Sequence, residues 1–282
     1  MHMKKKQKRT LWGIIIALVV IVGGYFSFVR PHQQANKTVT VGIMSGTQKD
    51  DQLWDNVAKT AKDKYGITLK FKKFTDYNQP NKALSNGDVD LNAFQHKLFL
   101  KEWNEAHHTD IVSLGDTMIT PIRVYSNQYK SLNDLPDGAT IAVPNDATNE
   151  SRALFALKNA GIFNIKKGTK LATIKDITDN KKNVKIKELS AEQVARSLKD
   201  VDAAVINTNY ASAAGIDYKS AIFVEPTNQD SKQWVNVIAV DKKNADKQAL
   251  KDVVKAYQTE SNKQLMKKLY GEAQVPAWDL KF

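Results

Sequence analysis

Alternation of short apolar strands with amphipathic helices is the feature that most limits how this chain can fold. Val39, Val41 and Ile43 alternate with small or polar residues, which predicts a strand, and helically spaced apolar residues follow as far as Tyr65. Gly66 then stands where a glycine commonly ends a helix. The same order of strand and helix recurs along the chain, and it is typical of α/β proteins with mainly parallel sheets.

Two runs of alternating elements are predicted, and the chain connects them twice. The stretch from Ile111 to Tyr125 is apolar but interrupted by Pro121, so we expect one strand to leave a first sheet and another to enter a second sheet. A second connection is expected near residues 225–234, followed by a strand and by a helical C-terminus over 245–270. The predicted boundaries are 38–122 for the first part of lobe 1, 123–228 for lobe 2, and 229–282 for the return to lobe 1 with the C-terminal helix.

The N-terminus combines a basic segment with an apolar one. Residues 1–10 contain five lysines and arginines, and the nineteen residues from Leu11 to Val29 carry no charge. A helix of that length spans about 28 Å, close to the roughly 30 Å hydrocarbon core of a membrane. The preceding bases place the N-terminus in the cytoplasm. We therefore predict a single-pass cell-membrane protein with a transmembrane helix at 11–29, a tether at 30–37 and an extracytoplasmic binding domain. A cleaved signal peptide is the alternative.

Charge and composition exclude several functional classes. The chain has 42 basic and 30 acidic residues, and six of the bases precede residue 31, which leaves 36 against 30 in the rest. Lysines there are interspersed with acids, which is typical of a solvated surface and argues against nucleic-acid binding. The absence of cysteine excludes a cysteine nucleophile and a lipid attached to an N-terminal cysteine. No catalytic or calcium-binding motif is present, so we predict no catalytic residue, no cofactor and no metal site.

Aromatic, cationic and amide side chains fall near the expected carboxyl ends of strands, where α/β proteins bind ligands. They are Tyr77, Phe94, His96, Arg152, Asn207 and Asn236. A guanidinium can hold a carboxylate through two N–H groups, amides can bind an ammonium, and aromatic rings favour a thioether. The set predicts a small zwitterionic ligand. Each residue also has a structural interpretation as a surface charge, core residue or cap, so the residues alone support only a small-molecule-binding protein.

The segments that carry these residues resemble the MetQ/NlpA family, the methionine-binding proteins of ABC importers. The matching segments are FTDYNQPNKAL, GDVDLNAFQHKLFL, IAVPNDATNESRAL, AAVINTNYA and VNVIAV, spread between about Thr38 and Trp278. The resemblance implies a two-lobed α/β fold of the type II periplasmic-binding-protein kind, with a ligand cleft between the lobes. It implies ligand contacts from Tyr77, Phe94 and His96 in one lobe, a carboxylate contact from Arg152, and polar contacts from Asn207 and Asn236.

The resemblance therefore implies a non-enzymatic, extracytoplasmic receptor that captures L-methionine or a related zwitterion. The implied partner is an ABC permease with its ATPase, and we expect the receptor to be a monomer. Three alternatives stay open: the same fold with a methionine-containing dipeptide or another apolar amino acid, an extracellular enzyme with His96 as general base beside Asp76, and a protein that binds anionic cell-wall polymers. Trp234 stands where the family often has a shorter turn with a tyrosine, so a cleft-side position would change the shape of the pocket.

Overall fold

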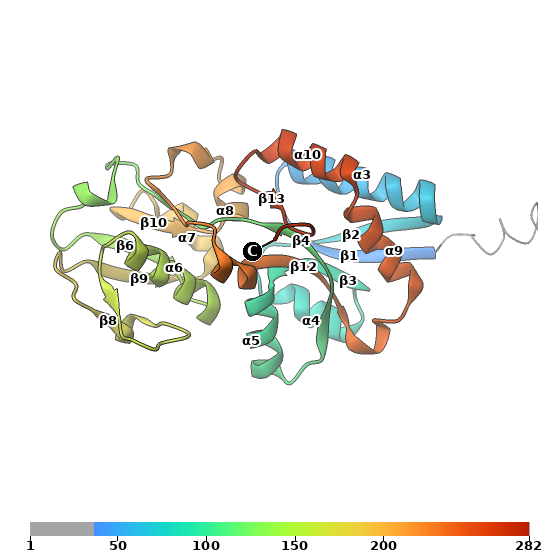
Figure 1. Ribbon diagram of the computed structural model, residues 1–282, viewed down its shortest axis with the longest axis horizontal. Helices are drawn as coiled ribbons and strands as arrows, with labels where there is room; N and C mark the ends of the chain where they lie inside the picture. The colour runs from blue at the N-terminus through green and yellow to red at the C-terminus, as the bar shows by residue number, and fades with distance from the viewer. Residues whose placement is uncertain (1–36, 282) are drawn as a thin grey trace, which may run out of the picture.

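Two β-sheets organise residues 37–281, the part of the chain that the computed structural model describes, and they lie side by side along the long axis of the molecule (Figure 1). In spatial order, the six-stranded sheet consists of β13 (Val275–Pro276), β4 (Ile111–Ile119), β12 (Val235–Asp241), β3 (Leu91–His96), β1 (Lys37–Met44) and β2 (Ile67–Phe74). The five-stranded sheet consists of β11 (Phe223–Val224), β5 (Arg123–Tyr125), β10 (Ala203–Ile206), β6 (Thr140–Pro144) and β9 (Lys185–Leu189). We call each sheet with its helices a lobe, the six-stranded one being lobe 1.

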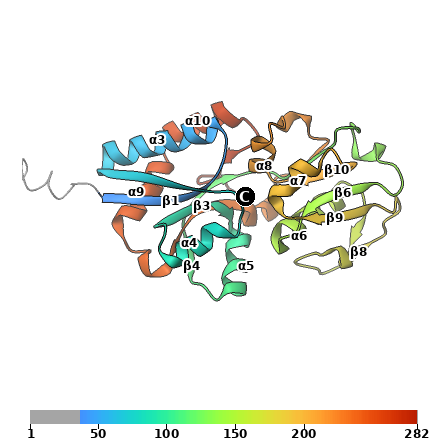
Figure 2. The ribbon, with the colours of Figure 1, turned by 180° about the vertical axis from the view of Figure 1, so that it is seen from behind.

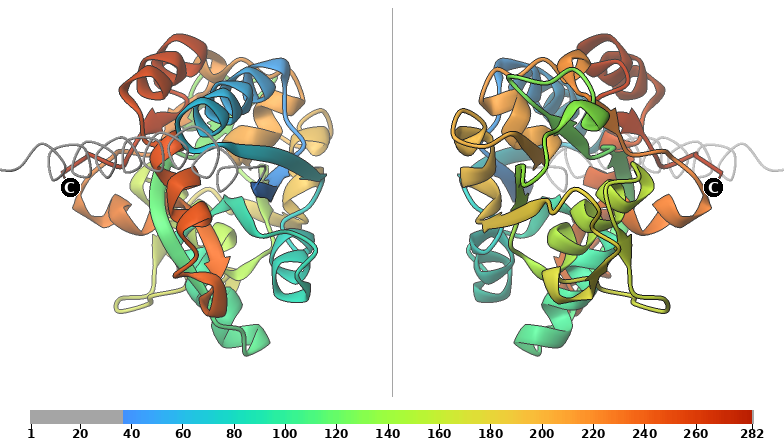
Figure 3. Two further views of the ribbon diagram at one scale, coloured as in Figure 1. Left: turned by 90° about the vertical axis from the view of Figure 1, so that its right-hand side faces the viewer. Right: turned by 90° about the vertical axis from the view of Figure 1, so that its left-hand side faces the viewer.

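Helices cover both faces of the lobe 1 sheet. On one face lie α3 (Gln48–Tyr65), α9 (Gln248–Tyr257) and α10 (Glu260–Tyr270), and on the other lie α4 (Gln79–Asn86) and α5 (Lys97–His107), as Figure 2 shows. In lobe 2 the helices are α6 (Ala147–Asn159), α7 (Ala191–Ser197) and α8 (Thr208–Ala213), and a hairpin of β7 (Asn164–Ile165) and β8 (Ile177–Thr178) lies at its far end. The end-on views in Figure 3 show the helices arranged around the sheets. Each lobe therefore buries its own apolar core.

The ends of α3 follow the local sequence signals. Thr47 and Asp50 form a capping box, in which the Asp50 carboxylate accepts from the backbone N–H of Thr47 at 2.6 Å. At the other end Gly66 adopts a left-handed conformation with φ of 68°, and its N–H donates to the carbonyl groups of the last turn. The predicted helix end at Gly66 is confirmed, and a residue with a Cβ would be strained there.

Both sheets are mixed, so the prediction of mainly parallel sheets is wrong. β1 runs parallel to β2 and β3, whereas β12 runs antiparallel to its neighbours β3 and β4. The chain leaves lobe 1 along β4 and returns along β12, so these two neighbouring strands run in opposite directions. In lobe 2, β5 is likewise antiparallel to β10, while β6 is parallel to both β9 and β10.

The chain passes between the two sheets at two places. The first connection, residues 120–122, joins β4 to β5, and the second, residues 225–234, joins β11 to β12 through the short helix η5 (Gln229–Trp234). The lobe boundaries at 122 and 228 stay predictions. The single C-terminal helix predicted over 245–270 is wrong, because α9 ends at Tyr257 and Thr259 caps a new helix by accepting from Asn262 N–H.

The predicted membrane segment falls outside this description. Residues 1–36, which hold the predicted basic segment, the transmembrane helix at 11–29 and all but the last residue of the tether, lie outside the described residues. Among residues 37–281, none of the helices combines the length and the apolar character needed to cross a membrane.

Gly115 on β4 is a position where packing excludes a side chain. A Cβ built there would lie 2.5 Å from Cγ1 of Val254 and 2.9 Å from Nε2 of Gln258. We expect Gly115→Ala to lower the free energy of unfolding in urea by about 1–3 kcal/mol, since overpacking forces α9 away from the sheet. Adding Val254→Ala removes the contacted methyl group and should recover part of the loss. Simple additivity of the two losses would contradict this explanation.

Candidate functional site

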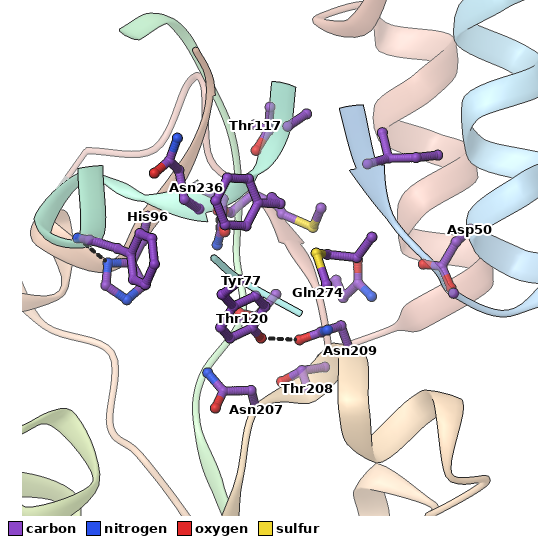
Figure 4. Close-up of a pocket in the computed structure, with 18 of the residues that line it drawn as sticks. Asp50, Tyr77, His96, Thr117, Thr120, Asn207, Thr208, Asn209, Asn236 and Gln274 are labelled. Carbon is purple, nitrogen blue, oxygen red and sulfur yellow. Dashed lines mark hydrogen bonds between the residues drawn. The ribbon is translucent and has the colours of Figure 1, made fainter. Parts of the chain in front are cut away.

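A cavity of about 100 Å³ lies between the lobes, at the carboxyl ends of β1, β3 and β10 (Figure 4). Loops meet there because each of these strands ends at the edge that faces the other lobe. The six residues predicted from the sequence all line it: Tyr77, Phe94, His96, Arg152, Asn207 and Asn236. The structure thus brings the predicted set together, while their contacts with a ligand stay a prediction.

His96 is the last residue of β3 and caps α5. Its Nδ1 accepts a hydrogen bond from the backbone N–H of Phe99 at 3.0 Å, so the proton of a neutral ring lies on Nε2. Burial, and secondly the positive charge of Arg152, lower the pKa of His96 to about 3. Nε2 is buried, and although the Asn149 side chain nearby opposes the lowering of the pKa, no hydrogen bond of standard geometry reaches Nε2 from residues 37–281. His96 therefore presents a neutral N–H group to the cavity.

This arrangement disfavours a general base. One ring nitrogen of His96 is already bonded to the backbone and the other carries the proton, so no lone pair is free to take a proton from a ligand. Asp76, the acid considered beside it, is not among the residues that line the cavity. The Asp76 carboxylate instead accepts from the backbone N–H groups of Asn78 and Gln79.

Arg152 lies on α6 and is 2% exposed. Its Nε lies 3.1 Å from both carboxylate oxygens of Glu225, its Nη2 lies 2.6 Å from Oε2 of Glu225, and Nη2 also donates to the Thr120 carbonyl at 3.0 Å. Glu225 therefore occupies the Nε and Nη2 edge of the guanidinium. Because Thr120 accepts the second N–H of Nη2, the Nη1 and Nη2 edge is not free for a two-point contact either. Nη1 makes no hydrogen bond among the described residues. We therefore replace the expected two-point contact between Arg152 and a ligand by a contact through Nη1 alone.

Trp234 does not line the cavity but supports the groups that do. Its ring packs edge-on against His96 at 5.0 Å and lies 4.7 Å from the guanidinium carbon of Arg152. We predicted that Trp234 would change the shape of the pocket if it bordered the cleft, and it does not border the cavity. It can affect the cavity only through its contacts with His96 and Arg152.

Aromatic rings form one wall of the cavity. Tyr77 packs against Phe94 at 6.0 Å between ring centroids and against Tyr210 of lobe 2 at 5.0 Å. The Tyr77 hydroxyl donates to Oδ1 of Asn209 at 2.5 Å, so this residue reaches across from lobe 1 to lobe 2 (Figure 4). Burial raises the pKa of the Tyr77 hydroxyl well above its usual value, which keeps it a donor.

Amide groups from both lobes complete the site. Asn207 donates through Nδ2 to Oδ1 of Asn149 at 2.8 Å, and Asn236 donates to the Met118 carbonyl at 3.4 Å. The Oδ1 of Asn207, the Nδ2 of Asn209 and the Oε1 of Gln274 are buried without hydrogen-bond partners among residues 37–281. Buried polar atoms are nearly always paired in folded proteins. These atoms therefore mark places where a polar ligand would complete the hydrogen bonding.

Several of the lining residues were missed from the sequence. Asn149 lies one turn before Arg152 on α6, and this spacing on one helix face was a usable signal. Gln274 enters from the segment after α10, far along the chain, and no local pattern predicts it. Other lining residues that were missed include Gln95, Thr117, Thr120 and Asn209. Within residues 37–281, no group of three or more histidines and acids is placed to hold a metal ion.

Two α/β lobes joined by two connections, with a polar and aromatic cavity between them, define the class of two-lobed substrate-binding proteins. Comparison with known proteins gives the family. The family model described as NlpA lipoprotein matches residues 39–278, and the chain belongs to this family. The resemblance inferred from the sequence is confirmed.

Relatives and solved structures agree with this assignment. The "Probable D-methionine-binding lipoprotein MetQ" of Haemophilus influenzae is 39% identical over 280 residues, which cover 98% of this chain and 100% of the relative. The "D-methionine-binding lipoprotein MetQ" of Escherichia coli K12 is 40% identical and covers 85% of this chain and 88% of its own. The substrate-binding protein of a methionine transporter from Streptococcus pneumoniae superposes with a TM-score of 0.82 at 43% identity, covering 86% and 96% of the two chains. A nutrient-binding protein from Burkholderia cenocepacia bound to methionine gives 0.81 at 45% identity, covering 85% and 99%.

The predicted transmembrane anchor and single-pass location are corrected by these findings. The MetQ relatives are named lipoproteins, and no helix of residues 37–281 is long and apolar enough to span a membrane. The prediction used the length and apolarity of residues 11–29, two properties that do not distinguish a permanent span from other apolar N-terminal segments. The two-lobed α/β part of the predicted fold class agrees with the structure.

Proposed function

We propose that this protein captures methionine between its two lobes and delivers it to an ABC permease with its ATPase, without covalent chemistry. The observation that carries the proposal is the cavity itself, where unpaired buried donors and acceptors face an aromatic wall. The names of the relatives and the methionine bound to the Burkholderia cenocepacia protein support the choice of ligand. That the receptor acts as a monomer stays a prediction.

The proposed pose follows from the chemistry of the lining groups. The ligand carboxylate accepts from Nη1 of Arg152 and from Nε2 of His96, which is a donor without charge. The ammonium group donates to Oδ1 of Asn207, an acceptor with no partner among the described residues. The thioether then lies along Tyr77 and Phe94, where each sulfur–aromatic contact adds about 0.3–1.5 kcal/mol.

Calorimetry on the purified protein tests this proposal. The protein is unfolded, dialysed and refolded to remove bound small molecules, and then titrated with L-methionine and D-methionine. We expect binding at a 1:1 ratio with a dissociation constant at or below about 1 μM. Saturating ligand should also raise the stability of the folded state, by about 2.7 kcal/mol at a hundred times the dissociation constant.

Analogues identify which groups are recognised. Norleucine keeps the chain length but lacks sulfur, and methioninol lacks the carboxylate, so both should bind more weakly than methionine. A methionine-containing dipeptide that binds more tightly than either enantiomer would change the ligand but keep the class. If neither enantiomer of methionine releases or absorbs heat on titration or raises the melting temperature of the protein, the methionine proposal is refuted.

A further inference from the structure

Glu225 lies behind Arg152 and is not among the residues that line the cavity. It pairs with Nη2 of Arg152 at 2.6 Å, and the two side chains are only 13% and 2% exposed. A carboxylate and a guanidinium at this distance form a charge-assisted pair, and here the pair is largely removed from water. As a unit the pair carries no net charge.

The same carboxylate joins the two connections between the lobes. The backbone N–H of Ile122, on the first connection, donates to Oε2 of Glu225 at 3.1 Å, and the N–H of Glu225 donates back to the Ile122 carbonyl at 3.0 Å. Arg152 adds a hydrogen bond to Thr120, also on the first connection. The guanidinium is therefore fixed from both connections, with its Nε and Nη2 edge turned to Glu225 and Nη1 left for a ligand.

We infer that Glu225 is a positioning residue that sets the charge preference of the site, by neutralising Arg152 so that a zwitterion is favoured over a ligand of net negative charge. The inference rests on the proposed function, since it needs a ligand carboxylate at Arg152. A lone guanidinium in a poorly solvated cavity attracts any anion strongly, whereas a paired one offers directed N–H groups with little net field. His96 adds a second donor that carries no charge.

Three ligands with the same thioether side chain test this inference. They are 4-(methylthio)butanoate with a net charge of −1, methionine with none, and methioninamide with +1. We expect Glu225→Gln to improve the affinity for the anion relative to methioninamide by about tenfold compared with the wild type. A general loss of packing would instead weaken all three ligands by the same factor.

Two further variants control the comparison. Asp230→Asn on η5 removes the same charge five residues away, at an exposed carboxylate, and should leave the ratio of affinities unchanged. If Glu225→Gln does not fold, Glu225→Asp carries the test. The side chain of aspartate is one methylene group shorter, so its carboxylate lies further from Arg152. The affinity for the anion relative to that for methioninamide should therefore still rise, by a smaller factor than in Glu225→Gln.

The outcomes separate the inference from the proposed function. A wild-type protein that binds no methionine overturns both. If the wild type binds methionine but the Glu225 variants leave the ratio of the affinities for the anion and methioninamide unchanged, the inference alone is overturned. The inference is also overturned if Asp230→Asn changes this ratio as much as the Glu225 variants do. A selective gain for the anion in the Glu225 variants supports the assignment.

Discussion

Arg152→Ala is expected to weaken methionine binding by about 2–5 kcal/mol and to lower the free energy of unfolding by about 3–5 kcal/mol. The binding loss follows from removing the cation that faces the ligand carboxylate. The stability loss follows because the Glu225 carboxylate, which is 13% exposed, is left without its charged partner. Calorimetry measures the first effect and urea unfolding measures the second.

A double variant separates the two effects of Arg152. Removing Glu225 as well, in Arg152→Ala with Glu225→Ala, should recover part of the stability but none of the affinity, since no buried charge is then left unpaired. Arg196→Ala on α7 is the matched control, because Arg196 is exposed and does not line the cavity between the lobes. An affinity for methionine that Arg152→Ala leaves unchanged would rule out the carboxylate contact.

Local sequence patterns carried enough information to predict which residues gather at the cavity. Phe94 and His96 end β3, and Asn207 follows β10, so a rule about strand ends placed them without any knowledge of pairing. Arg152 was predicted for a similar reason, because a helix that follows a strand begins at the same edge. These positions depend on the type of element and on its ends, which short segments of sequence determine.

Contacts between distant segments were not predictable in this way. The antiparallel pairing of β4 with β12 joins strands more than a hundred residues apart, and strand direction depends on which strands become neighbours. Likewise, the sequence suggested that Arg152 could bind a ligand carboxylate through two N–H groups. In the structure the carboxylate of Glu225, 73 residues further along the chain, occupies the Nε and Nη2 edge of the guanidinium. The sequence pattern therefore predicted that Arg152 lies at the cavity, but it overestimated the number of guanidinium N–H groups left without a partner.

The buried state of His96 predicts a specific pH dependence of stability. The ring has a pKa of about 3 in the folded protein, against about 6.5 for an unperturbed histidine. Below pH 6.5 the unfolded chain therefore takes up a proton that the folded protein does not bind. Acid therefore favours unfolding. The contribution of His96 to the free energy of unfolding is complete above pH 6.5 and is lost progressively as the pH falls toward 3.

Glu150 changes the stability with pH in the opposite direction to His96, so the experiment has to cancel the contribution of Glu150. Burial, and secondly Glu188, raise its pKa to about 7, so Glu150 favours the folded state increasingly as the pH falls from 7 toward its unfolded value of 4.5. A comparison of the wild type with a His96 variant removes this effect, because both proteins contain Glu150.

His96→Asn is the variant that isolates the ring. Asparagine is a strong N-cap residue, so its Oδ1 can replace Nδ1 as the acceptor for the Phe99 N–H at the start of α5. We expect the wild type to lose about 3 kcal/mol of unfolding free energy relative to His96→Asn between pH 7.5 and pH 4.5, measured by urea unfolding. His96→Gln, which keeps a donor near the Nε2 position, should bind methionine better than His96→Asn at pH 7.5. A stability difference that stays constant over this range would show that folding does not lower the pKa of His96. The assignment of His96 as a donor that burial keeps uncharged below pH 6.5 would then have to be abandoned.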